Sequence, residues 1–310
     1  IRAFINGIYP RTEELIESTR TYNKKLNQLY TKEKEENIKL QINAGLTHIK
    51  DPLLNWDDMF RPFSQNLKGV EVGSLDRFFE NNTFYKKPKV TGKIEGNGEI
   101  ISNNTIMNFP DSEKYKVELP DPFTFATLCE NLYYKDFSQL LSDIGNALKQ
   151  EVKTIMKSGC DIIQFNAPSL TQVKDMDIMN QIKDTYREML AGVNIETYVN
   201  VYFSDIKDVY KHILDFGIYG IGIDLINSNI NEIKEYGIPK SIIFGCINAQ
   251  NTLLENPKNI ANNILEILEQ INITEYGIST NCDLEFVPEE FAQKKIHIIG
   301  NTLKILKEDK

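Results

Sequence analysis

Four cysteines carry the most reactive chemistry in this chain, because a thiolate is both a nucleophile and a metal ligand. They are Cys129, Cys160, Cys246 and Cys282. They are widely spaced and form no Cys-x-x-Cys pair, so the pattern is not a disulfide framework and favours a reducing, cytoplasmic setting. Cys282 is distinctive because it ends the β-rich run YGISTNC (276–282), shortly before a helical pattern that begins after Pro288.

Cys282 has two interpretations. As a small apolar side chain it would pack in a core, and as a thiolate it would hold a metal or a substrate. Asp224 and Cys246 lie in two other apolar runs, so the three residues could form a metal site with water in the fourth position. Alternation along FGCIN (244–248) puts Cys246 and Asn248 on one face, which permits this site without requiring it.

The histidines offer Cys282 no partner. His212 and His297 lie in helical patterns and are expected on the outer surface, whereas His48 lies inside a candidate strand and is expected in the core. A Cys–His nucleophile is therefore unsupported.

A second cluster combines an aromatic ring with charges. In NWDDMFRPF (55–63), Trp56 stands beside Asp57 and Asp58, and Arg61 follows four positions after Asp57. These side chains would suit a flat heterocycle with an acidic tail. The alternative is a helix start, with Asn55 as the cap and the acids in the first turn.

The order of strands and helices predicts where these residues meet. Apolar runs alternate with helical patterns and indicate parallel β/α units. We expect strands at 1–9, 46–50, 115–122, 160–168, 194–203, 220–226, 241–248 and before Cys282. We expect helices within 12–45 and at 137–159, 171–191, 205–216, 229–236, 257–271 and 288–308.

This order predicts an α/β chain folded as a single (β/α)₈ TIM barrel over residues 1–310. Glycine and asparagine clusters predict a hairpin insertion at about 68–116. The site of such a barrel lies at the carboxyl ends of its strands. There the chain places Arg11, where it could meet an anion, and an amide-rich rim of Asn166, Asn200 and Asn248.

Composition excludes two classes of partner. The net charge of −9 and the pI of about 5.1 argue against a nucleic-acid groove, which needs clustered Lys and Arg. The chain has no apolar run of 18 residues, so no membrane span is expected.

Several stretches, in order, resemble the cobalamin-independent methionine synthase family in the form of its short, single-barrel archaeal members. They include GIYPRTEEL (7–15), GLTHIKDPLLNWDDMFRPF (45–63), GCDIIQFNAPSL (159–170), GCINAQNTLLENP (245–257) and NCDLEFVPEEFAQKKI (281–296). The resemblance implies a barrel in which zinc holds the homocysteine sulfur as a thiolate. That thiolate attacks the methyl group of a methylated folate or related pterin.

The resemblance also implies that the metal site is altered. Cys282 falls on the family's eighth-strand cysteine, and Asp224 replaces a glutamate ligand. Tyr198 and Asn200 stand where the family has the histidine and cysteine of His-x-Cys, and neither is a usual zinc ligand.

The family's substrate-binding acids are replaced as well. Asn166-Ala167-Pro168 takes the place of the family's Asp-Glu-Pro. Leu53 replaces a glutamate, Asn248 replaces an aspartate and Gln250 replaces a histidine. The resemblance therefore implies a barrel whose zinc binding is doubtful.

Three hypotheses follow. The first is a zinc-poor companion, or donor-binding subunit, that works with a zinc-bearing catalytic barrel of methionine biosynthesis. The second is an autonomous methyltransferase that uses a different acceptor or the reduced Asp224/Cys246/Cys282 site. The third is a non-catalytic regulatory paralogue.

Overall fold

A curled parallel sheet forms the centre of the computed structural model, which describes residues 1–21, 24–110 and 112–308. Its seven strands run in the order β1-β10-β9-β8-β7-β6-β4. Their bounds are Arg2–Asn6 (β1), Tyr276–Asp283 (β10), Ser241–Ile247 (β9), Gly220–Asp224 (β8), Glu196–Val201 (β7), Ile162–Asn166 (β6) and Lys116–Pro120 (β4). Every neighbouring pair is parallel, so all the strands end on the same side of the sheet.

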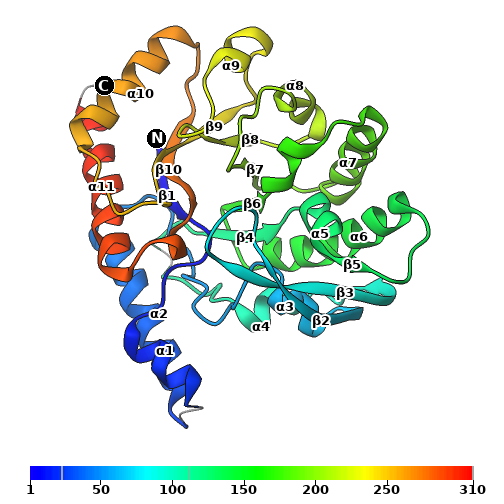
Figure 1. Ribbon diagram of the computed structural model, residues 1–310. Helices are drawn as coiled ribbons and strands as arrows, with labels where there is room; N and C mark the ends of the chain where they lie inside the picture. Colours follow the sequence, from blue (N-terminus) through cyan, green and yellow to red (C-terminus); the bar gives the residue numbers. More distant parts are fainter. Residues whose placement is uncertain (22–23, 111, 309–310) are drawn as a thin grey trace.

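Helices cover the outside of this sheet (Figure 1). The α-helices are Glu13–Arg20 (α1), Leu26–Asn43 (α2), Arg61–Asn66 (α3), Ile100–Asn104 (α4), Pro122–Leu128 (α5), Phe137–Lys157 (α6), Met176–Met189 (α7), Tyr210–Ile213 (α8), Asn231–Tyr236 (α9), Pro257–Gln270 (α10) and Glu289–Glu308 (α11). Short 3₁₀ helices lie at Pro168–Gln172, Leu214–Phe216 and Leu284–Phe286. No helix in the described ranges is long and apolar enough to cross a membrane.

The expected strand at 46–50 is reduced to a bridge between the two ends of the sheet. The amide of Thr47 donates to Ala3 of β1 over 3.0 Å. On the other side, Ile49 pairs in parallel with Tyr115, and Lys116 of β4 donates to the Ile49 carbonyl over 2.9 Å. The segment therefore contacts both edge strands, although it is too short to form a named strand.

The expected helix at 205–216 was wrong in its first half. The Asp205 carboxylate accepts the amide of Lys207 over 3.0 Å, and a turn occupies 207–209. This local bond competes with helical hydrogen bonds. The α-helix begins only at Tyr210.

A β-hairpin precedes β4 in the chain and belongs to a separate sheet. Its strands are Lys68–Arg77 (β2) and Phe84–Glu95 (β3), which pair antiparallel, and the short β5 (Glu130–Asn131) extends it. The hairpin tip lies near the carboxyl ends of the parallel strands, because Gln250 in the loop after β9 donates to Asn81 over 3.0 Å.

The interior of the sheet has an apolar layer at the amino ends of its strands. Phe4, Ile162, Tyr198 and Ile243 form one fully buried cluster there. A polar layer follows toward the carboxyl ends, and it is built from residues of β1, β4, β6 and the segment before Asp51. This change from apolar to polar places the chemistry at the carboxyl ends.

Candidate functional site

A pocket of about 500 Å³ opens at the carboxyl ends of the strands, between the loops that follow β1 and β10. Arg11, Trp56, Asp57 and Glu285 are among the residues that line it. We call it the mouth pocket. Three of the residues predicted from sequence to bind a ligand therefore lie on one cavity.

Arg11 is fixed by the loop that carries Trp56. Its Nε donates to the Leu54 carbonyl over 2.7 Å, and its Nη2 donates to the Trp56 carbonyl over 3.1 Å. The same Nη2 lies 2.9 Å from Oδ1 of Asp57. These bonds hold the guanidinium beside the pocket.

Asp57 joins two arginines. Its other oxygen accepts from Arg61 over 2.7 Å, and Arg61 in turn contacts the buried Asp58 over 2.8 Å. Burial raises the pKa of Asp58, and Arg61 opposes that shift. The predicted cluster of Asp57, Asp58 and Arg61 is thus assembled as one chain of ion pairs.

Trp56 is less accessible than a stacking platform needs. Its side chain is 3% exposed, packs edge-to-face on Phe63, and donates its indole N–H to the Asn104 carbonyl over 3.3 Å. The alternative of a helix capped by Asn55 was wrong, because α3 begins at Arg61 and Asn55 donates to the same Asn104 carbonyl. Trp56 contributes only part of its surface to the pocket.

Glu285 was not singled out from the sequence. It lines both the mouth pocket and a smaller cavity shared with Asp58 and Asp283. Burial raises the pKa of Glu285, repulsion by Asp283 and Asp58 adds to this, and Arg11 opposes it. Its position three residues after Cys282, at the end of a predicted strand, was the available sign.

Below the mouth pocket lies a buried network around Glu118, which sequence reasoning also missed. Glu118 contacts Lys50 over 3.0 Å and Lys116 over 2.7 Å, and it accepts the amide of Gly7 over 2.9 Å. Burial alone would raise the pKa of Glu118, but the two lysines lower this pKa to about 2. Charged residues inside the apolar run KVELP (116–120) were the available indication.

The three amides of the predicted rim have different surroundings. Asn166 joins the network, because its Nδ2 donates to Glu118 over 3.3 Å and its oxygen accepts from Gln164 over 2.7 Å. Asn200 lies opposite Asn166 in the strand register, and its Nδ2 is buried without a hydrogen-bond partner. Asn248 instead shapes its own loop by accepting the amide of Gln250 over 2.8 Å.

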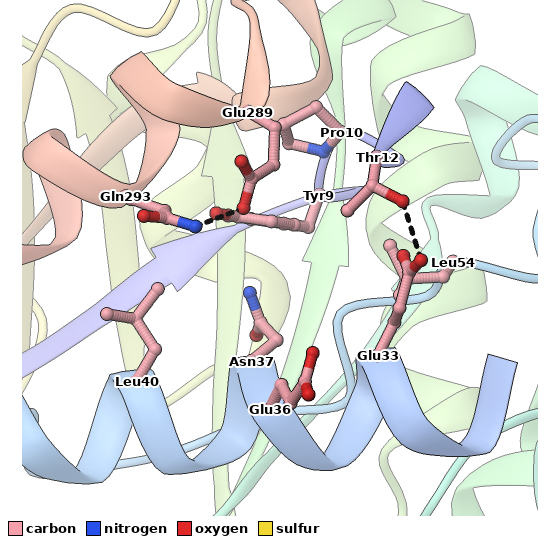
Figure 2. Close-up of a pocket in the computed structure, with 10 residues that line it drawn as sticks. All are labelled: Tyr9, Pro10, Thr12, Glu33, Glu36, Asn37, Leu40, Leu54, Glu289 and Gln293. Carbon is pink, nitrogen blue, oxygen red and sulfur yellow. Dashed lines mark hydrogen bonds between the residues drawn. The ribbon is translucent and has the colours of Figure 1, made fainter. Parts of the chain in front are cut away.

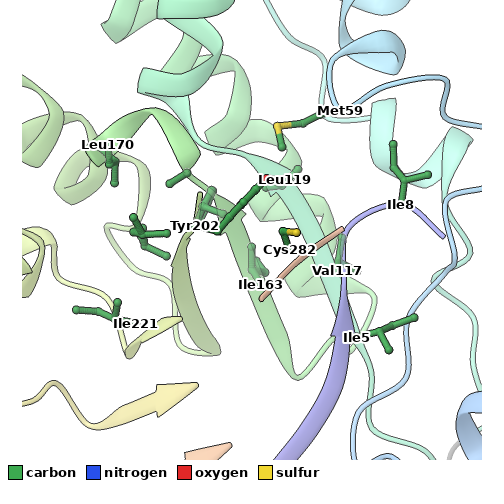
Figure 3. Close-up of a cluster of buried hydrophobic side chains, with 14 of the residues drawn as sticks. Ile5, Ile8, Met59, Val117, Leu119, Ile163, Leu170, Tyr202, Ile221 and Cys282 are labelled. Carbon is green, nitrogen blue, oxygen red and sulfur yellow. The ribbon is translucent and has the colours of Figure 1, made fainter. Parts of the chain in front are cut away.

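The residues considered as metal ligands from the sequence lie in separate surroundings. The ring of Tyr198 belongs to the apolar layer, and the Asp224 carboxylate accepts three bonds from its own and the neighbouring loop. Cys246 lines an outer cavity between the loop that follows β8 and helix α10, whereas Cys282 is fully buried in the main core (Figure 3). Across the described ranges, no three His, Cys, Asp or Glu side chains are grouped closely enough to hold a metal ion.

Cys282 is held in the protonated form by its surroundings. Burial raises the pKa of the thiol well above its usual value, and the carboxylates of Asp283 and Asp224 raise it further. Its Sγ donates to Oδ1 of Asn281 over 3.5 Å. These contacts are those of a packed thiol.

Aromatic side chains close part of the mouth. Phe78 and Phe79 at the hairpin tip pack on Phe203, which in turn packs on Phe286 after β10. Phe79 and Phe203 have backbone φ angles of 53° and 74°, and residues other than glycine rarely adopt such positive angles. Such strained residues occur at ligand clamps and functional loops.

Comparison with known proteins finds relatives over nearly the whole length of this chain. The model of the cobalamin-independent synthase, N-terminal domain, matches residues 53–272. The methionine synthase of Sulfolobus acidocaldarius is 26% identical and covers 97% of this chain and 91% of its own length. That of Saccharolobus solfataricus is 25% identical and covers 98% and 94%.

Two solved structures share the fold. A B12-independent methionine synthase from Shewanella sp. W3-18-1, in complex with selenomethionine, superposes with a TM-score of 0.80 at 16% identity, covering 99% of this chain and 98% of that one. A putative vitamin-B12 independent methionine synthase from Listeria monocytogenes gives 0.76 at 17% identity, covering 100% and 98%. At this level of identity the likeness concerns the fold alone.

Proposed function

Because this chain belongs to the cobalamin-independent synthase family, we propose that it is a donor-binding barrel that works with a separate zinc-bearing catalytic barrel. In this role it would bind a methylated folate or related pterin, and its partner would hold homocysteine on zinc. We also propose that the segment around Ile49 completes a closed barrel of eight strands, since it is hydrogen-bonded to both β1 and β4.

One observation carries this proposal. The places of the expected histidine and cysteine ligands are taken by Tyr198, which fills the apolar layer, and by Asn200, whose amide lies in the polar interior. A tyrosine and an amide supply neither the thiolate nor the imidazole that zinc sites use. The matching family model, which describes an N-terminal domain, supports a role beside a catalytic barrel.

The mouth pocket supports donor binding. Its volume of about 500 Å³ lies within the usual range for small-molecule sites. Arg11 would face the acidic tail of the donor, since a guanidinium binds carboxylates through paired N–H groups. Glu285, kept protonated by its surroundings, could donate a hydrogen bond to the heterocycle.

The single tryptophan provides the test, because Trp56 lines this pocket. We would titrate the purified chain with 5-methyltetrahydrofolate and follow tryptophan fluorescence, with calorimetry as a second readout. We expect saturable binding that Arg11→Gln weakens about tenfold, the usual loss for one charge-assisted contact. Arg187→Gln is the matched control, since Arg187 lies on α7 and bonds the Asp215 carbonyl.

Absence of saturable binding, or equal weakening by both substitutions, would reject donor binding at this pocket. The companion role has its own test, which is co-purification of a zinc-bearing barrel with the tagged chain from its native source. Failure to recover such a partner under conditions that retain donor binding would count against the subunit role.

An autonomous methyltransferase is the second candidate. It is favoured by the archaeal relatives, which are called methionine synthases and of which this chain covers 91% and 94%. Methyl transfer to homocysteine, or to another thiol, by the isolated chain would establish this alternative and reject the need for a partner.

A further inference from the structure

A second cavity, of about 140 Å³, lies behind the loop that follows β1, between α2 and the start of α11. We call it the acidic cavity (Figure 2). Tyr9, Pro10 and Glu289 line both this cavity and the mouth pocket, so they form the wall between the two.

Three glutamates line the acidic cavity, Glu33 and Glu36 from α2 and Glu289 from α11, and no lysine, arginine or histidine lines it. Glu33 accepts from the Thr12 hydroxyl over 2.5 Å, and Glu289 accepts from the Gln293 amide. Within the described ranges, the one ion pair of these glutamates joins Glu36 to exposed Lys32, over 3.9 Å. The negative charge of the cavity is therefore poorly compensated.

Electrostatics within the cavity agree with this. Burial raises the pKa of Glu33, and repulsion from Glu14 and Glu36 adds to the shift. A cation among these carboxylates would relieve that repulsion.

Two buried polar groups also lack a hydrogen bond of normal geometry there. Tyr9 is 4% exposed and Asn37 is 5% exposed. The Tyr9 hydroxyl faces Asn37 and Glu289. Neither this hydroxyl nor Nδ2 of Asn37 makes a hydrogen bond of normal geometry, and both groups lie on the cavity (Figure 2). Buried polar groups are normally satisfied, so these two leave hydrogen-bonding capacity that a ligand atom would use.

We propose that the acidic cavity binds a small organic ammonium ion that carries a hydroxyl or carbonyl oxygen. The ammonium group would donate to the glutamates, and its oxygen would accept from Asn37 and Tyr9. Leu40, Leu54 and Pro10 would contact the carbon skeleton. A cavity of about 150 Å³ holds a molecule the size of benzene, so the ligand has about that size.

A directly coordinated metal ion fits these residues less well. Hard cations need several oxygen ligands at about 2.0–2.6 Å. In the part of the chain that the structure describes, no three acidic side chains are grouped that closely. The aliphatic walls also favour a ligand with carbon atoms over a hydrated ion.

The test compares three isosteric probes by saturation-transfer NMR and calorimetry on the full chain. They are 3-aminopropan-1-ol, which has both groups, butylamine, which lacks the oxygen, and 1-butanol, which lacks the charge. We expect saturable binding of the amino alcohol, weaker binding of butylamine and none of 1-butanol. Equal behaviour of the three probes, or binding of magnesium or calcium chloride without the amino alcohol, would overturn the proposal.

Variants locate the binding. Glu289→Gln should weaken binding of the amino alcohol by at least about tenfold, because the site loses one charged acceptor. Glu290→Gln is the matched control, since the adjacent Glu290 points to Lys294 and does not line the cavity. Tyr9→Phe, which removes only the unpartnered hydroxyl, keeps the test valid should Glu289→Gln fail to fold. Equal affinity of Tyr9→Phe, Glu290→Gln and the unmodified chain would reject the site.

Discussion

Lys50 and Glu118 form an ion pair of 3.0 Å inside the curled sheet, where each side chain is only 2% exposed. They come from different sides of the segment 51–115, so the pair links the bridge at Ile49 to β4. Lys116 contacts the second oxygen of the same carboxylate. One buried carboxylate thus pairs with two buried lysines.

Removing that charge should be costly. We expect Glu118→Gln to lower the free energy of unfolding by about 3–5 kcal/mol, because it leaves buried ammonium groups uncompensated. The measurement is urea unfolding at neutral pH. Glu95→Gln is the control, since Glu95 pairs with Lys68 at the exposed hairpin and its loss should have no measurable effect. Equal effects of the two substitutions would contradict this account.

The same carboxylate should make stability depend on acid. Lys116 and Lys50 lower the folded-state pKa of Glu118 to about 2 from its ordinary value of 4.5, against the effect of burial. Its ionised form therefore stabilises the fold fully above pH 4.5, and that stabilisation is lost as the pH falls toward 2. Between pH 6 and pH 3, the unmodified chain should lose more unfolding free energy than Glu118→Gln. A parallel decline of both proteins would show that other carboxyl groups dominate.

The sequence could predict the strands of the second half because each is a short apolar run bounded by turn residues. The run 241–248, for example, became β9 at Ser241–Ile247. The segment 205–216 could not be placed as well, because the bond from the Lys207 amide to the Asp205 carboxylate competes with a helical apolar pattern. The segment 46–50 was predicted in the right place, but it contributes a bridge rather than a full strand.

The candidate site was predictable only where its residues are close in the sequence. Trp56, Asp57 and Arg61 lie close together in the sequence, so the sequence pattern alone reveals the cluster. The contact between Lys50 and Glu118 joins residues far apart in the chain and leaves no local pattern. Glu285 meets Asp58 in the same way, through the fold alone.

A close approach of two helices gives a prediction about packing. A Cβ on Gly300 of α11 would lie 1.8 Å from the Ala44 carbonyl oxygen at the end of α2. We expect Gly300→Ala to destabilise the fold by about 1–3 kcal/mol, since backbone cannot move aside cheaply. Gly145→Ala on α6 is the control, because its Cβ would meet side-chain atoms of Thr185 and no backbone atom outside its own helix within 4 Å. Thermal and urea unfolding should show the larger loss for Gly300→Ala, and the reverse order would contradict the assigned contact.

The last prediction concerns Cys282 and zinc. Cys282 is packed in the core and Cys246 lines an outer cavity. We therefore expect the purified protein to retain only a background level of zinc after dialysis against excess zinc and then buffer. In the native chain, a thiol reagent should spare Cys282, and Cys246→Ser should remove more of the observed reaction than Cys282→Ser. Elemental analysis and thiol titration provide these two measurements. About one zinc per chain, lost in Cys282→Ser but retained in Cys246→Ser, would make Cys282 a ligand. Such a result would reject the zinc-poor premise of the companion role.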